Sequence, residues 1–90
     1  MNTEQMIHKY FGSAENPYEL FQANHFKLKI ENAMKGDVIS LNGHKWDVIK
    51  EINKTSEKNP VNKQPVYYIE LGVGNPVRRT GDVVVDAVKV

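Results

Sequence analysis

The sequence predicts an α+β domain that is mainly β, with one or two short N-terminal helices packed on a strongly bent antiparallel sheet or small barrel of about five strands. First, the apolar period changes from near four to two at His25. Second, Gly36 to Ile52 places two apolar runs around Asn42-Gly43, which is typical of a β-hairpin. Ninety residues form a single domain, 1–90, in which a helical N-terminal segment covers residues 1–24 and a sheet or barrel covers residues 25–90.

Two helix patterns open the chain. Thr3 is a suitable N-cap for a helix that runs through Phe11, and Gly12 is placed to end it. Asn16-Pro17 then supplies an N-cap and a first helical position for a second helix that ends near Asn24. Their aromatic residues are expected to pack against the sheet, with a partner-binding surface as the alternative.

The segment after His25 alternates apolar and charged residues, because charged residues separate Phe26, Leu28 and Ile30. This pattern predicts a strand with one solvent-exposed face. In the hairpin, Asn42-Gly43 predicts a tight turn, since both residues tolerate positive φ. The apolar phase slips near Ile49-Lys50, where either a β-bulge or a strand apolar on both faces explains it.

The second half of the chain predicts more strands. Residues 53–65 are polar and rich in lysine, which predicts a long mobile loop. Val66 to Leu71 has strong strand composition, and Val77 to Thr80 fits a short strand. The run Val83 to Val90 is apolar on both faces, so this strand is either sandwiched in the interior or paired with another subunit.

The composition is that of an ordinary globular protein, with 40% hydrophobic and 26% charged residues. Twelve basic and 11 acidic residues give a net charge of +1, which disfavours a general nucleic-acid binder but leaves a local basic patch open. No cysteine is present, which excludes disulfides and thiol chemistry. Neither a signal peptide nor a membrane span is apparent, so we expect a cytoplasmic protein.

No set of residues forms a recognised catalytic or metal site, so we predict no enzyme, no metal and no cofactor. His8, His25 and His44 lack the spacing of a zinc motif. Asp37 and Asp82 follow glycines as turn residues do, and Asp47 and Asp86 fit the polar side of strands. A carboxylate pair for acid–base work among these four residues is the alternative.

Lys35 to Ile39, followed by Gly43, Trp46 and Val48, resembles the opening hairpin of SH3-like small barrels. Gly81-Asp82 precedes a second apolar run in the same way that Gly36-Asp37 precedes the first. The short, cysteine-free chain also resembles small accessory or assembly proteins of bacteriophages and prophages. The SH3-like resemblance implies a barrel and leaves the activity open, because such barrels have many functions.

We therefore predict a non-catalytic protein-binding module that self-associates or docks on a larger complex. The predicted partner-binding residues are Tyr67, Tyr68, Val84 and Val88. The alternative is a small nucleic-acid-binding barrel that uses Lys45, Tyr67, Arg78 and Arg79 as an aromatic and basic surface. Lysines that only solubilise the surface and protect strand edges would explain the same charges.

Overall fold

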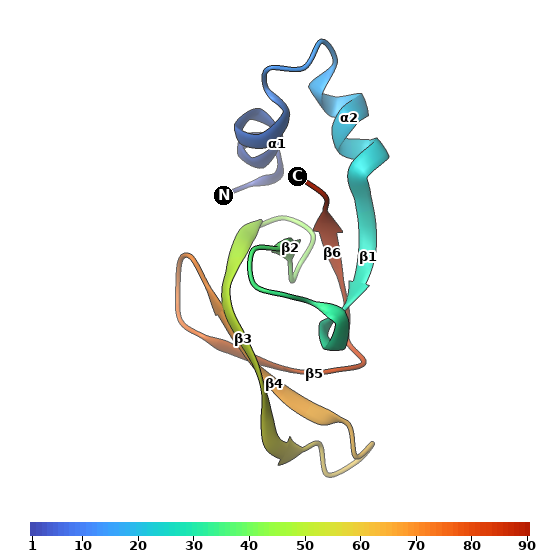
Figure 1. Ribbon diagram of the computed structural model, residues 1–90, viewed down its shortest axis with the longest axis vertical. Coiled ribbons are helices and arrows are strands. Elements are labelled where there is room, and N and C mark those ends of the chain that lie inside the picture. The colour runs from blue at the N-terminus through green and yellow to red at the C-terminus, as the bar shows by residue number, and fades with distance from the viewer.

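The computed structural model describes residues 1–90, and it confirms the α+β, mainly β class. The chain forms helices α1 (Thr3–Phe11) and α2 (Pro17–Asn24), strand β1 (His25–Lys29) and the short 3-10 helix η1 (Ile30–Asn32). It continues through strands β2 (Val38–Ser40), β3 (Asp47–Lys58), β4 (Pro65–Leu71), β5 (Val77–Thr80) and β6 (Val84–Val88). The helices lie at one end of the long axis and the β3–β4 hairpin at the other (Figure 1).

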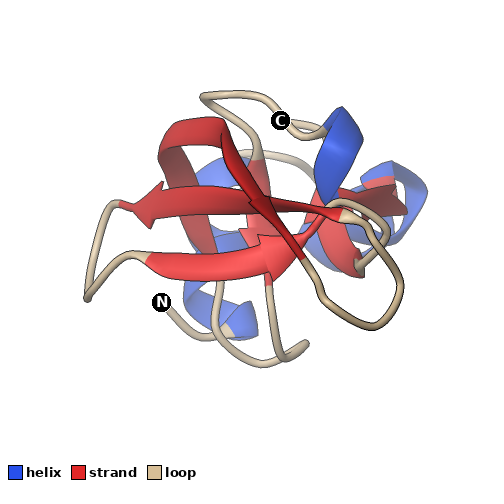
Figure 2. Ribbon diagram, turned by 90° about the horizontal axis from the view of Figure 1, so that it is seen from below, coloured by secondary structure: helices blue, strands red, loops and turns tan.

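All six strands join one antiparallel sheet in the order β1-β6-β2-β3-β4-β5. The sheet bends strongly, and Figure 2 shows its strands curling so that their inner faces converge. Although η1 packs against β5, strands β1 and β5 do not pair, so the sheet stays open. The six strands agree with the prediction of about five, and the predicted strand after α2 pairs with the outer side of β6.

Strand β6 is apolar on both faces because it separates two buried clusters. The helix-side cluster lies under α1 and α2 and comprises Met6, Phe11, Phe21, Val38, Trp46 and Val88. The sheet-side cluster fills the inside of the curled sheet and comprises Ile30, Ile39, Ile49, Ile69, Val85 and Ala87. The interior position of β6 explains its composition without a second subunit, although Val84 remains 52% exposed.

The first helix begins one residue earlier than predicted. Its N-cap is Asn2, whose side chain accepts a hydrogen bond from the Gln5 N–H while the Gln5 side chain accepts one from the Asn2 N–H. The Thr3 hydroxyl, predicted to be the cap, instead accepts a hydrogen bond from the Trp46 indole at 3.0 Å. The second helix agrees with its prediction, since Asn16 caps it and Pro17 is its first residue.

The central hairpin exists, but its turn is wider than predicted. Val38 pairs with Val48 and Ile39 with Asp47, so residues 41–46 form the connection and Asn42-Gly43 lies within it. The connection is wide because Trp46 turns into the helix-side cluster and its backbone bonds to Met1. The predicted bulge is present as a register shift between Ile49 and Glu51.

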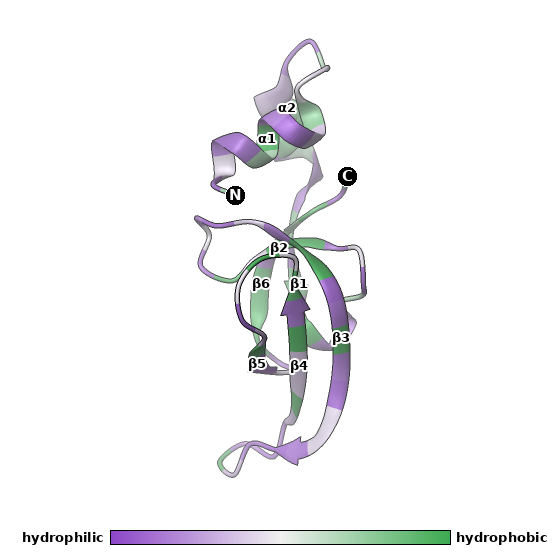
Figure 3. Cartoon of the chain, turned by 90° about the vertical axis from the view of Figure 1, so that its left-hand side faces the viewer, coloured by the Kyte–Doolittle hydropathy of each residue, from purple (hydrophilic) through white to green (hydrophobic).

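The long loop is shorter than predicted, because residues 53–58 continue strand β3. This distal part of β3 is hydrophilic, as Figure 3 shows, and projects beyond the clusters with β4. Hydrogen bonds of Asn59 hold the remaining tip: its side chain accepts from the backbone N–H of Val61 at 2.8 Å, and its carbonyl accepts from Lys63. A polar strand forms here because the backbone of β4 supplies its hydrogen-bond partners.

Candidate functional site

Strand β1 is an edge of the sheet with an unpaired side. Along β1, the Asn24 carbonyl accepts from Lys89 and the Ile30 N–H donates to Val83, so the even-numbered residues direct their backbone groups toward β6. The N–H and C=O groups of Lys27 and Lys29 consequently point outward. Strand β6 is the only helix or strand that packs extensively on β1.

The two faces of β1 differ in character. Phe26 and Leu28 lie on the face of the sheet-side cluster, where Phe26 is 41% exposed at the rim. Lys27 and Lys29 lie on the opposite face, and Lys29 has no carboxylate within ion-pair distance. A segment that pairs with this edge would therefore meet apolar side chains on one face and cations on the other.

A small polar cluster fixes the start of β1. The Asp86 carboxylate accepts a hydrogen bond from the Lys27 ammonium and lies 3.0 Å from the His25 ring nitrogen. The Lys27 hydrogen bond holds the pKa of the Asp86 carboxyl below its ordinary value; partial burial opposes this shift and the His25 hydrogen bond adds to it. His25 also stacks on Phe21 at 5.5 Å between ring centroids, so the cluster connects α2 to the sheet.

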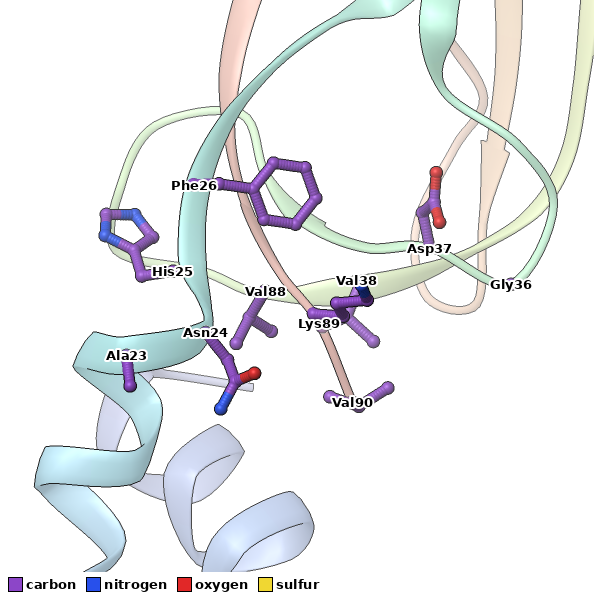
Figure 4. Close-up of a pocket in the computed structure, with 10 residues that line it drawn as sticks. All are labelled: Ala23, Asn24, His25, Phe26, Gly36, Asp37, Val38, Val88, Lys89 and Val90. Carbon is purple, nitrogen blue, oxygen red and sulfur yellow. The ribbon is translucent and has the colours of Figure 1, made fainter.

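A hollow lies beside the start of β1, where the chain ends. It has a volume of about 530 Å³ and lies between the α2–β1 junction, residues 36–38 and residues 88–90. In Figure 4 the Phe26 ring and the Asp37 carboxylate border it on one side, while His25 points away. Its apolar lining includes Val90, which is exposed, and the nearly buried Val38 and Val88 at its base.

The predicted partner-binding residues do not form one surface. Tyr67 pairs with Arg79 and Tyr68 with Arg78, and neighbours along a strand point to opposite faces, so the two tyrosines lie on opposite sides of the sheet. Val88 is 4% exposed and belongs to the helix-side cluster, which leaves no surface for a partner. Val84 is exposed beside Lys29 of β1, next to the open edge.

The four residues of the nucleic-acid alternative are also divided. Arg79 shares a face with Tyr67, whereas Arg78 lies on the other face and donates a hydrogen bond to Glu57 at 2.8 Å. Lys45 lies in the connection between β2 and β3, where it forms a bridge with Asn2 at the helical end. Of that set, only Tyr67 and Arg79 therefore lie side by side on one face.

Serine, histidine and aspartate approach one another at one place, where they lack catalytic geometry. Ser40 pairs with Asp86 across β2 and β6, but its hydroxyl donates to the Asn42 side chain and the residue is 1% exposed. A substrate carbonyl has no route to that oxygen. No cluster of three or more histidine, cysteine, aspartate or glutamate residues is arranged to hold a metal ion.

The sequence pattern missed the most informative residues. Phe26 was identified as a strand residue, but its exposure on an edge strand follows from the pairing of β1 with β6, which no local pattern reveals. His25 and Asp86 are separated by 61 positions, so only the pairing of β1 with β6 brings them together. The one local signal is that Asp86 is the single charged residue of the otherwise apolar strand β6.

Neither helix is long and apolar enough to cross a membrane. Comparisons with family models, with curated proteins and with solved structures gave no match to this chain.

Proposed function

We propose that the protein is a non-catalytic binding module that docks on another protein through the open edge of β1. The observation that carries this proposal is the outward-facing backbone of Lys27 and Lys29 beside the exposed ring of Phe26. An extended segment of a partner would add as a further strand, and backbone hydrogen bonds would supply most of its affinity.

The charges of the edges favour a different protein over a second copy. Antiparallel pairing of two β1 edges would bring Lys27 and Lys29 against lysines of the other copy. Strand β5, the other edge of the sheet, carries Arg78 and Arg79, so pairing of β1 with β5 also opposes cations. The fitting partner is an extended segment that alternates acidic residues, facing the lysines, with apolar residues, facing Phe26 and Leu28.

The wider context of the proposal comes from the resemblances of the sequence. Strands β2 to β5 follow one another in the sheet and β6 returns beside β2, which supports the resemblance to SH3-like barrels. The resemblance to small phage and prophage accessory proteins supports a role in docking on a larger assembly, inside the cytoplasm. Both the SH3-like fold family and the phage-type role are therefore parts of what we propose.

The test uses a short synthetic peptide that alternates glutamate with valine, and a control peptide that alternates lysine with valine. Titration is followed by the backbone amide signals of the isotope-labelled protein in NMR. We expect the acidic peptide to shift the amides of Lys27 and Lys29 most, and the lysine peptide to leave them unchanged. Shifts located elsewhere would refute docking at this edge.

A proline variant separates backbone pairing from charge. Lys29 has φ −75° and ψ 141°, which suits proline, and its N–H points outward, so Lys29→Pro removes a donor without breaking the ladder to β6. Lys29→Gln removes the same charge and keeps the donor. We expect Lys29→Pro to weaken peptide binding more than Lys29→Gln does. Equal binding by Lys29→Pro and the unmodified protein would contradict strand addition.

A further inference from the structure

A row of three side chains crosses the β3–β4–β5 region of the sheet. Lys54 pairs with Tyr67, and Tyr67 pairs with Arg79, so all three point to the same face. Directly paired residues in antiparallel strands have Cβ atoms about 5 Å apart. The aromatic ring is therefore flanked by a cation on each side.

The two cations of this row have no carboxylate partner, whereas Arg78, their neighbour on the opposite face, has one. Arg78 is bound by Glu57, and Lys35, near the same strands, is bound by Glu51. Lys54 and Arg79 have no carboxylate within 4.0 Å, and Arg79 instead donates to the Arg78 carbonyl at 2.8 Å, which steadies its guanidinium. Arg78 and Arg79 thus differ in available charge although they are neighbours in sequence.

The charge is also unequal along the molecule. Residues 53–80 contain five basic and two acidic side chains, a net charge of +3, so the rest of the chain carries −2 within the total of +1. The β3–β4 hairpin lies at the end of a 47 Å axis, opposite the helices (Figure 1). A basic end that projects from a less basic body attracts a polyanion and orients it toward the hairpin.

The Tyr67 ring gives the row a means of binding a nucleic-acid base in addition to a simple anion. Tyr67 is half-buried, because its ring packs beside Gly81 and against the sheet-side cluster, while Lys54 and Arg79 occupy the paired positions on either side of it. A planar base can stack on such a ring while the phosphates on either side contact the cations. Duplex bases are stacked on each other and are not free to do so.

We propose that the Lys54–Tyr67–Arg79 row binds single-stranded nucleic acid, with one base on Tyr67 and phosphates at Lys54 and Arg79. This row shares no residue with the β1 edge, so the two proposals stand or fall separately. The row is a short site; it contributes a few phosphate contacts, and its affinity depends strongly on salt.

The test compares two variants at adjacent positions. Arg79→Gln and Arg78→Gln each remove one positive charge from β5, but only Arg79 lies on the Tyr67 face. Binding of a fluorescent single-stranded pyrimidine oligonucleotide is followed by anisotropy over a series of salt concentrations. Thermal unfolding of each variant checks that the fold is intact. Lys54→Gln is measured in the same way as the cation on the other side of the ring.

We expect binding at low salt that Arg79→Gln and Lys54→Gln weaken and Arg78→Gln leaves nearly unchanged. Each lost phosphate contact lowers the slope of log affinity against log salt by about 0.7, which is about fivefold in affinity for a tenfold change in salt. Absence of binding at low salt overturns the proposal. Equal weakening by Arg78→Gln and Arg79→Gln also overturns it, because the attraction would then depend on overall charge and not on the row. Tighter binding of the same sequence as a duplex would overturn the choice of a single strand.

Discussion

Trp46 joins the helices to the sheet, and Trp46→Phe tests this connection. The indole ring is 2% exposed, contacts Phe21 edge-to-face at 5.9 Å between centroids, and donates its N–H to the Thr3 hydroxyl at 3.0 Å. Phenylalanine keeps an aromatic ring but removes the donor and the second ring of the indole. The change therefore separates the hydrogen bond and local packing from the need for an aromatic side chain.

The expected loss of stability has two components of similar size. A net hydrogen bond contributes about 1 kcal/mol. Phenyl in place of indole leaves a gap of about 40 Å³, which costs about 1 kcal/mol at about 24 cal/mol per Å³. The free energy of unfolding should fall by about 2 kcal/mol, which corresponds to a melting temperature about 8–16 °C lower for a domain of this size.

The measurement is urea unfolding followed by far-ultraviolet circular dichroism, because the variant has no tryptophan fluorescence. Thr3→Val removes the acceptor with little change in shape, and the double variant completes the cycle. Because the two side chains share a hydrogen bond, we expect Trp46→Phe to lower the free energy of unfolding by about 1 kcal/mol less when Thr3 is already valine. If the two changes are additive, or if Trp46→Phe alone costs under about 0.5 kcal/mol, Trp46 does not connect the helices and the sheet as described.

Three further predictions concern the fold. Asp86→Asn should lower stability at neutral pH by about 1 kcal/mol, because Lys27 lowers the pKa of the folded carboxyl. Since that stabilisation is present above the unfolded pKa of about 3.9 and is lost as pH falls through the folded pKa, urea midpoints of the two proteins should converge in acid. Asn2→Ala should cost about 1 kcal/mol by removing the cap of α1, measured by thermal unfolding. Gly81→Ala should cost about 1–3 kcal/mol in urea unfolding, since the new Cβ would lie 2.9 Å from the Tyr67 ring; no loss would show that this ring is free to move.

The local elements of this protein follow from its sequence. Asn16-Pro17 and the apolar spacing determine α2, because a helix start depends on residues within one turn. The alternation after His25 predicts β1, and the phase slip at Ile49 located an irregularity, since both are properties of neighbouring residues. Of the two explanations for that slip, the pairing with β4 shows the register shift of a bulge. The boundary of α1 was missed by one residue because Thr3 and Asn2 are both good caps, and the distant indole of Trp46 engages Thr3.

Only the tertiary structure decided which strands meet and what their faces contain. The valines of β6 fit either an interior strand or a subunit contact, and pairing with both β1 and β2 gave the interior strand. Residues 53–58 looked like a loop because their own side chains are polar, yet β4 supplies the hydrogen bonds that make them a strand. The alignment of Lys54, Tyr67 and Arg79 likewise comes from register across three strands. Propensity acts over a few residues, whereas register is set by burying all the strands' apolar faces at once.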